Sequence, residues 1–208
     1  MRFMVRFLAL MAISSPLAWA ASPKASSTLR DSNGKQHVAS NAFDGLLQTG
    51  WAEGQEGLGD GSWIELPLDR SVDVSSVSVW PGNLAQGARS LREYSRPRTL
   101  KVQLFLTNGE QVEEEVRLQD GVQVGPKRVD VPIVGKAKKV RVTINDSFEG
   151  GVFTDVFISE IALNFTKGGS PRIVEKLQAW EGSTSGKRAM DRNKDEIVEL
   201  FETINSAE

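Results

Sequence analysis

One loop early in the chain has residues suited to holding a hard metal ion. The stretch 40–51 contains the Asp44 carboxylate, the Thr49 hydroxyl and Gly45, a residue that tolerates a tight turn. A tight turn brings carboxylate, hydroxyl and loop carbonyl oxygens together, and calcium prefers such oxygen ligands. The competing interpretation is a plain turn, because Asp and Gly are common turn residues whether or not an ion is bound.

The Gly-rich loop that follows carries three acidic residues, Glu53, Glu56 and Asp60. Two carboxylates held at a fixed separation can hydrolyse a glycosidic bond, but the spacing in a flexible loop fixes no separation. A solvated or cation-facing surface is therefore the favoured interpretation. His37 is the only histidine and the chain has no cysteine, which excludes thiolate nucleophiles, zinc fingers and iron–sulfur clusters. We expect no enzymatic activity.

The elements that must position these residues are predicted to be β-strands. Apolar and polar residues alternate after a small, polar segment at 21–36, which we expect to be a flexible leader. Strands are predicted over 64–68, 77–80, 100–106, 112–118, 129–133, 140–144 and 158–165. The Asn108–Gly109 pair is the clearest hairpin turn. No amphipathic helix separates these strands, so the pattern favours an antiparallel β-sandwich over a parallel sheet.

Residues 1–20 have the features of a secretory signal peptide. Arg2 and Arg6 precede the short apolar run 7–13, and Ala18 and Ala20 form a small-residue cleavage site. The run is much shorter than the ~20 residues that span a bilayer. We expect cleavage after Ala20, export to the periplasm or the medium, and a change in net charge from −2 to −4 through the loss of two arginines.

The chain changes character again after Phe165. Residues 167–208 are predicted to form a linker and a short helical tail. The stretch 191–202 matches an EF-hand loop at five positions, but Glu196 stands where that loop needs glycine, so a helix start is the favoured interpretation. A short tail has no core of its own, which makes residues 172–208 a candidate contact for a protein partner.

Several strings in the β region resemble a known family. The strings NAFDG at 41–45, TGW at 49–51 and DVFISEI at 155–161 resemble the opening and closing signatures of discoidin-like (coagulation factor C-type) galactose-binding domains. The strings WAEG at 51–54 and SRPR at 95–98 are similar to the NADase-type glycan-binding branch. One departure is Ser62, which stands where that branch has an acid before Trp63, so the resemblance does not specify the ligand.

The resemblance implies an all-β jelly-roll sandwich over 37–166, with a structural calcium ion between the first loop and the last strand. The implied ligands are the side chains of Asp44, Thr49 and Glu160 and the main-chain oxygens of Asn41, Leu47 and Ile161. The chemistry of Glu160 agrees, because a carboxylate in an apolar strand is costly unless a cation or a hydrogen-bond donor meets it. Exposure of Glu160 at a sheet edge is the alternative.

The resemblance also implies a ligand site on the loops at one end of the sandwich. Segment 83–98 is the best ligand loop, because it is long for a strand connection and carries the only tyrosine, Tyr94, among arginines. Sugars are bound by an aromatic face together with planar or charged hydrogen-bonding groups. The candidate ligand residues are Trp51, Glu53, Trp80, Asn83, Arg89, Tyr94 and Arg96. Core packing is the competing interpretation for the aromatic residues.

Composition excludes some partners. The formal net charge of −2 and a pI near 5.6 argue against broad attraction to nucleic acid. The sequence therefore predicts an exported, non-catalytic, glycan-binding module with a structural calcium site. The alternative is a protein- or lipid-binding adhesion or scaffold domain of a secreted complex.

Overall fold

The fold is known from a computed structural model in which residues 22–165 are described. The expected signal peptide at 1–20 and the expected tail at 167–208 lie outside the described residues. The elements in chain order are β1 (Lys24–Ala25), η1 (Ala39–Phe43), β2 (Trp51–Ala52), β3 (Trp63–Pro81), α1 (Ala88–Glu93), β4 (Tyr94–Leu106), β5 (Gln111–Arg117), α2 (Gly121–Val124), β6 (Val129–Val131), β7 (Gly135–Phe148) and β8 (Phe153–Phe165).

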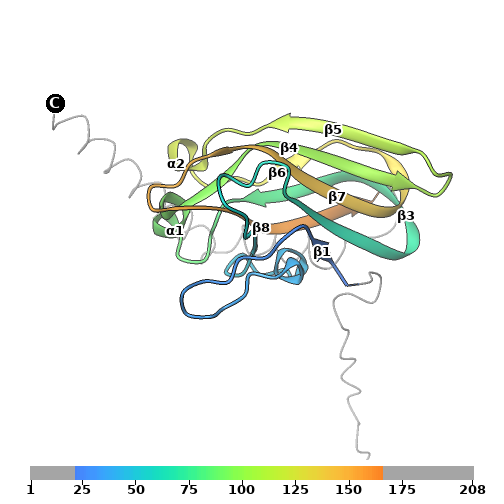
Figure 1. The fold of residues 1–208 in the computed structure, drawn as a ribbon. Coiled ribbons are helices and arrows are strands. Elements are labelled where there is room, and N and C mark those ends of the chain that lie inside the picture. Colours follow the sequence, from blue (N-terminus) through green and yellow to red (C-terminus); the bar gives the residue numbers. More distant parts are fainter. Residues whose placement is uncertain (1–21, 166–208) are drawn as a thin grey trace, which may run out of the picture.

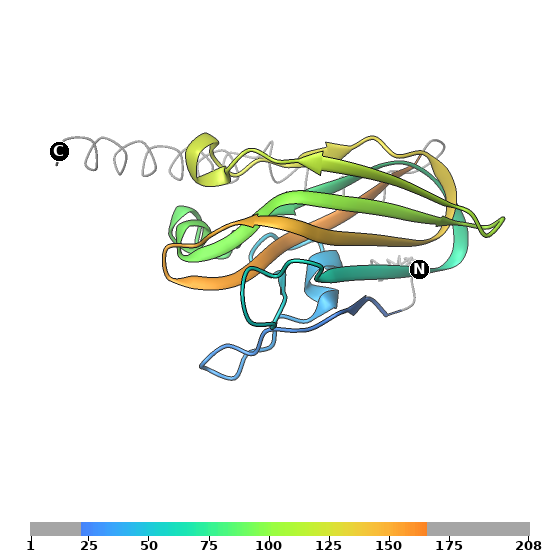
Figure 2. The ribbon, with the colours of Figure 1, turned by 45° about the horizontal axis from the view of Figure 1, so that its top comes forward.

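Strand β3 joins the two layers of the sandwich. Its first half pairs with β1 and β7, and its second half pairs with β6 and β8. Strands β4 and β5 extend the first layer beside β7, and β2 extends the second layer beside β8. All these pairs are antiparallel, and the short β4–β8 pair is parallel. The layers pack face to face (Figures 1 and 2), which confirms the all-β, antiparallel sandwich expected from the sequence.

The core lies between the two layers and follows the alternation seen in the sequence. On β4, Leu100, Val102 and Leu104 are all fully buried. The register places Val102 opposite Val142 of β7, which is also buried. Burial of each such side chain contributes about 1.5–3 kcal/mol. The alternating pattern therefore identifies the inward face of these strands correctly.

Strand β3 is longer than the sequence suggests. Separate strands were expected over 64–68 and 77–80, but one strand of 19 residues runs from Trp63 to Pro81. The register against β7 shifts between Pro67 and Val72, so the residues between these two have no partner in β7. Asp69 and Arg70 stay exposed there while the strand continues.

The expected leader is part of the fold over its described residues. Strand β1 pairs with β3, and Arg30 forms an isolated bridge with Gln36. Two hydrogen bonds join this segment to β2. Leu29 N donates to Ala52 O at 2.9 Å, and Trp51 Nε1 donates to Ser27 O at 2.9 Å. The domain therefore begins before residue 37, and the boundary expected at 36 is corrected.

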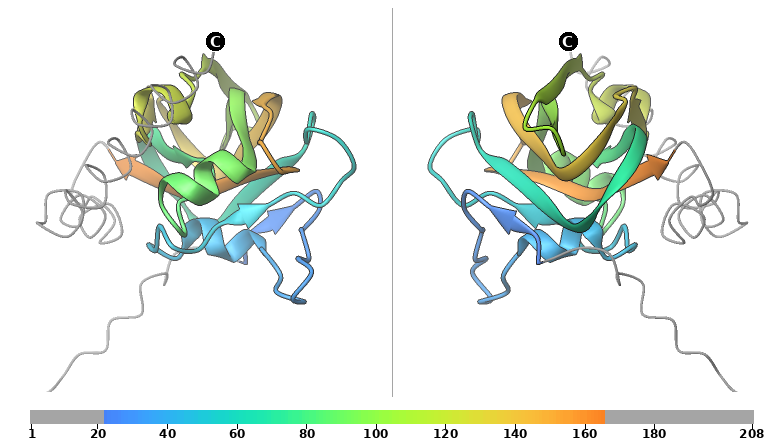
Figure 3. Two further views of the ribbon diagram at one scale, coloured as in Figure 1. Left: turned by 90° about the vertical axis from the view of Figure 1, so that its left-hand side faces the viewer. Right: turned by 90° about the vertical axis from the view of Figure 1, so that its right-hand side faces the viewer.

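The two ends of the sandwich differ. One end carries the β4–β5 hairpin, where Gly109 has a φ of +90° that a turn there requires. The other end carries α1, α2 and the connection between β7 and β8, on the left of Figure 1 and facing the viewer in the left panel of Figure 3. No helix among residues 22–165 is long and apolar enough to cross a membrane.

Candidate functional site

The hydroxyl of Thr49 lies among four acceptor oxygens. It is 2.9 and 2.8 Å from the two Asp44 carboxylate oxygens, 2.8 Å from Leu46 O and 3.3 Å from Asn41 O. A hydroxyl donates a single hydrogen, so it can satisfy only one of these oxygens. A group of oxygens with too few protons between them is a suitable set of ligands for a hard cation.

Glu160 approaches the same turn from β8. Ile158 and Ile161 both belong to the main core, and the register against β3 shifts between them. Two residues, Ser159 and Glu160, therefore lie between core positions. Glu160 Oε2 accepts a hydrogen bond from Gly45 N at 3.0 Å, so the last strand and the first loop meet at this carboxylate.

The second carboxylate oxygen of Glu160 has no hydrogen-bond partner among the described residues. Glu160 is 0% exposed, and its Oε1 is buried. Burial raises the pKa of Glu160 to about 9; the backbone N–H of Gly45 works against this rise, and the charge of Asp44 adds to it. A buried carboxylate with an unpaired oxygen needs either a proton or a cation.

The oxygens in this cluster fit calcium. Within the described part of the chain, no three His, Cys, Asp or Glu side chains gather for a metal. A cation here would have two carboxylates, a hydroxyl and carbonyl oxygens, which suits calcium and not a metal that prefers nitrogen or sulfur. Leu46, which the sequence did not single out, brings a carbonyl to Thr49. The carbonyls of Leu47 and Ile161, which the resemblance implied, accept no hydrogen bond from that hydroxyl.

Three expected ligand residues are buried and are corrected to structural roles. Trp51 and Glu53 are 0% exposed and Trp80 is 1% exposed. Trp51 packs in the main core, and Trp80 packs against Leu47 and Ala162 on the outer side of β8. These side chains cannot meet a ligand from solvent. Large aromatic residues supply much of the apolar area of a small core, which is why they lie inside.

Glu53 holds main chain together instead of binding a ligand. Its Oε1 accepts from Val156 N at 3.0 Å and its Oε2 from Gln55 N at 2.8 Å. Burial raises the pKa of Glu53 despite these hydrogen bonds. The Gly-rich loop closes over it, because a Cβ at Gly59 would lie 2.9 Å from Glu53 Cγ. Glu56 and Asp60 are exposed, so they do not share a common surface with Glu53.

The remaining candidates divide into supporting and exposed residues. Arg96 is 7% exposed and forms a bidentate ion pair with Asp120. Asn83 is 8% exposed, and its Oδ1 accepts from Ala85 N at 3.1 Å within the turn that precedes α1. Arg89 lies on the outside of α1 and pairs with Glu93 at 2.8 Å. Arg96 and Asn83 therefore shape the loops, and Arg89 remains open to solvent.

Tyr94 belongs to a row of aromatic rings at the loop end of the sandwich. Its ring stacks on Phe153 with centroids 4.6 Å apart and planes 22° apart. It also meets Phe157 edge to face at 4.7 Å, and Phe157 meets His37 at 4.8 Å. Phe153 is 41% exposed. The Tyr94–Phe153 stack, called the aromatic platform below, therefore presents an apolar ring surface to solvent.

Three acidic side chains lie near enough to Tyr94 for their charges to act on its hydroxyl. Burial raises the pKa of the Tyr94 hydroxyl, and the nearby charges of Asp155, Asp31 and Glu93 raise it further. Burial also raises the pKa of Asp155. His37 Nε2 lies 3.7 Å from Asp31 Oδ2. An apolar ring bordered by carboxylates is an arrangement that can stack on a sugar ring and accept hydrogen bonds from its hydroxyls.

Only one of the two platform residues was predicted from the sequence. Tyr94 was an expected ligand residue, whereas Phe153 was not, and neither were the neighbouring Asp155, Asp31 and His37. A signal existed for Phe153, because it follows the Gly150–Gly151 turn where an exposed apolar residue has no core to fill. No comparable signal existed for His37, which reaches the site from a different loop.

The fold is shared with several solved structures, each at low sequence identity. A mutant of the arabinofuranosyltransferase AftD from Mycobacteria matches with a TM-score of 0.53 and 21% identity, covering 71% of this chain and 11% of that protein. The family 32 CBM from C. perfringens NanJ in complex with galactose matches with a TM-score of 0.51 and 17% identity, covering 68% of this chain and 91% of the module. A mutant lectin binding domain of lectinolysin complexed with Lewis b matches with a TM-score of 0.51 and 15% identity. The match covers 74% of this chain and 98% of that domain.

The sequence itself matches a family model. No curated protein matches the chain. The model for the NAD glycohydrolase translocation F5/8 type C domain matches residues 18–164. This range contains the oxygen cluster around Thr49, the strand that carries Glu160 and the aromatic platform. The chain therefore belongs to the family of NAD glycohydrolase translocation F5/8 type C domains.

Proposed function

We propose that this chain is an exported, non-catalytic module that binds a glycan on the aromatic platform and is stabilised by calcium. The observation that carries the proposal is the stack of Tyr94 on the 41%-exposed ring of Phe153. A flat aromatic surface open to solvent gains free energy when the apolar face of a ligand covers it. The C–H face of a sugar is a suitable cover, because it is apolar and flat.

The polar groups beside the platform suit hydroxyl groups. Asp155 and Asp31 offer carboxylate oxygens that accept hydrogen bonds. A neutral sugar is favoured over an acidic one at this site, because Asp31, Asp155 and Glu93 give it negative charge. The fold likeness to modules solved with galactose and with Lewis b supports this class of ligand.

Binding without turnover is supported by the position of the acids. Glu53 is fully buried on backbone N–H groups, which takes it away from Glu56 and Asp60. The residues 1–20 support export, since they combine arginines, a short apolar run and a small-residue cleavage site.

The calcium part of the proposal rests on the oxygen cluster. Asp44, Thr49 and Glu160, with the carbonyls of Asn41 and Leu46, are the residues that would hold the ion. A bound divalent cation would supply the positive charge that the unpaired Glu160 Oε1 lacks. The ion would join the first loop to β8 and so hold the loop end in place.

The test is a glycan array followed by calorimetric titration of the best neutral oligosaccharide. Phe153→Ala is expected to weaken binding by about tenfold or more, because the exposed ring is lost. Tyr94→Phe, which keeps the stack, is expected to retain most of the affinity. The control is Val134→Ala, which truncates an apolar residue that is 65% exposed in the β6–β7 connection.

Two results would contradict the proposal. The first is an array on which no glycan binds to the parent chain. The second is equal affinity of the parent and Phe153→Ala for the selected glycan. Capture of a protein or an anionic lipid vesicle in place of a glycan would favour the adhesion or scaffold alternative.

A further inference from the structure

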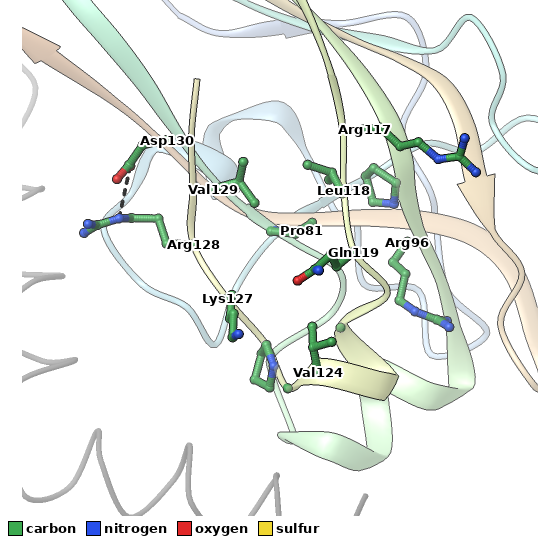
Figure 4. A pocket seen from close by; sticks show the side chains of 14 residues that line it. Pro81, Arg96, Arg117, Leu118, Gln119, Val124, Lys127, Arg128, Val129 and Asp130 are labelled. Carbon is green, nitrogen blue, oxygen red and sulfur yellow. Dashed lines mark ion pairs between the residues drawn. The ribbon is translucent and has the colours of Figure 1, made fainter. Parts of the chain in front are cut away.

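A concave region lies beside the loop end, between β5 and β6. Its volume is about 350 Å³. Its floor contains Pro81, Pro97, Leu118 and Val129, and the turn of α2 forms one wall. Figure 4 shows Gln119 directed into this space, with Arg117 on one side and Lys127 and Arg128 on the other. We call it the α2 pocket.

The α2 pocket is basic although the chain is acidic. Its lining includes Arg96, Arg117, Lys127 and Arg128 and only one acid, Asp130, whereas the whole chain has a net charge of −2. Clustering of one sign of charge in a cleft raises the local concentration of ligands with the opposite sign.

Two of the four cations are already neutralised and two are not. Arg96 pairs with Asp120, and Arg128 pairs with Asp130 at 3.1 Å. Arg117 and Lys127 are exposed, and neither forms an ion pair with a residue of the described range 22–165. The pocket therefore carries positive charge that an incoming anion can meet without breaking an existing ion pair.

The walls of the pocket are fixed before any ligand binds. Asp120 caps α2 by accepting from Val122 N at 2.9 Å, and the same carboxylate is held by Arg96. Pro81, Pro97 and Pro126 have restricted backbones. Gly125 has a φ of +82°, which lets the chain turn out of α2 toward β6. A preformed pocket loses less conformational entropy on binding.

The shape and lining indicate one class of ligand. The apolar floor suits the flat face of a pyranose ring, and Gln119 can exchange hydrogen bonds with hydroxyl groups. Cations on opposite sides of the pocket suit a ligand that carries carboxylates on more than one unit. We propose that the α2 pocket is a second binding site, specific for an acidic oligosaccharide of the uronate type.

The α2 pocket and the aromatic platform are separate sites with opposite charge. Tyr94, Phe153, Asp31, Asp155 and His37 are absent from the pocket lining, and Arg117 and Lys127 take no part in the platform. The choice of a carbohydrate ligand for the α2 pocket rests on the function proposed above. The residues that line the pocket are independent of the platform. A chain with both sites would hold a neutral and an acidic unit at the same end of the sandwich.

The experiment titrates the full chain with tetragalacturonate, with a neutral galactan tetramer and with sodium sulfate. Tetragalacturonate is expected to bind, and its affinity is expected to fall as salt rises, because exposed charges are screened. The double variant Arg117→Gln/Lys127→Gln is expected to bind it about tenfold more weakly, as loss of two charge-assisted contacts implies.

The matched control is Lys136→Gln/Lys138→Gln. It removes the same net charge from exposed positions at the hairpin end, where Lys136 O accepts from Thr107 N. This control is expected to keep the parent affinity, and the melting temperatures of all variants verify their folding. Phe153→Ala is also expected to keep tetragalacturonate binding, which separates this site from the platform.

Three results would overturn the inference. They are no binding of tetragalacturonate by the parent, equal loss of affinity in the control and the pocket variant, and equal affinity for free sulfate. Failure of the platform alone would leave tetragalacturonate binding intact and would contradict only the function proposed above.

Discussion

Arg96 and Asp120 form a bidentate ion pair, with Nε 2.6 Å from Oδ1 and Nη2 2.7 Å from Oδ2. The side chains are 8% and 12% exposed. Arg96 Nη1 also donates to Tyr94 O at 3.4 Å and to Glu149 O at 3.3 Å. One guanidinium therefore joins the α2 cap, the start of β4 and the connection between β7 and β8. Arg96 itself lines the α2 pocket, and through Tyr94 O it also contacts the main chain beneath the aromatic platform.

Removal of one charge of this pair should destabilise the domain. Asp120→Asn leaves a buried guanidinium without its partner, and breaking such a pair costs about 3–5 kcal/mol. The free energy of unfolding from urea titration measures this change. Arg89→Gln is the control, because its pair with Glu93 is exposed and worth less than about 0.5 kcal/mol. An equal, small effect in both variants would mean that the Arg96 pair is dispensable.

Gly150 should be intolerant of any side chain. A Cβ there would meet main-chain atoms of Tyr94, Phe153 and Glu93 at distances too short for carbon. Gly150→Ala must therefore move the main chain under the platform, and we expect a loss of about 2–3 kcal/mol together with weaker glycan binding. The matched control is Gly151→Ala, where the nearest atom would be Arg92 O at 3.5 Å. Similar melting temperatures and affinities for the two variants would show that the main chain at Gly150 accommodates a side chain.

Calcium should stabilise the folded chain. A ligand that binds only the folded state at a hundred times its Kd adds about 2.7 kcal/mol. We expect a chelator to lower the melting temperature of the parent by several degrees and to have no effect on Asp44→Ala, which lacks the central carboxylate. Thermal unfolding monitored by circular dichroism reports both. If the chelator leaves the melting temperature of the parent unchanged, the oxygen cluster is a turn that binds no calcium.

Without calcium, stability should fall as pH rises. The pKa of Glu160 is about 9 in the folded chain against an ordinary 4.5. Between these values the folded state keeps a proton that the unfolded state has released, so the free energy of unfolding decreases with increasing pH. Asp44 is the charged group that faces Glu160 and strengthens this trend.

The variant Glu160→Gln isolates that contribution. Other groups titrate in the same range, so the measured quantity is the difference in melting temperature between parent and variant in chelator, from pH 5.5 to pH 8.5. The parent should lose stability relative to Glu160→Gln across this window. Parallel curves would show that the carboxyl of Glu160 titrates normally. With calcium the trend should reverse, because protons compete with the ion at low pH.

The strands could be predicted because their signals are local. The alternation in 100–106 and 112–118 and the Asn108–Gly109 turn specify β4, β5 and their hairpin from neighbouring residues alone. The full length of β3 could not be predicted, because its polar middle around Asp69 and Arg70 has the composition of a loop. Pairing with β7, far along the chain, holds the residues on both sides of that segment, up to Pro67 and from Val72 onward.

The sites were harder to predict because they depend on distant segments. The oxygen cluster was found from the sequence because Asp44 and Thr49 lie in one short loop. The platform and the pocket combine loops that the sequence does not link. Trp51 and Trp80 are aromatic residues at strand ends, where ligand residues are common. Their burial depends on distant parts of the chain that cover them, such as Ser27 for Trp51 and β8 for Trp80.

Strand β3 also determines how this domain unfolds and folds. Because its 19 residues pair with β7 along one half and with β8 along the other, neither layer can detach while the other stays intact. The domain should unfold in one cooperative step. Its partners in β7 and β8 are about 60 to 90 residues later in the sequence, so most of β3 stays unpaired until those two strands have been synthesised. Folding should consequently be slow, because pairing between distant segments must form first.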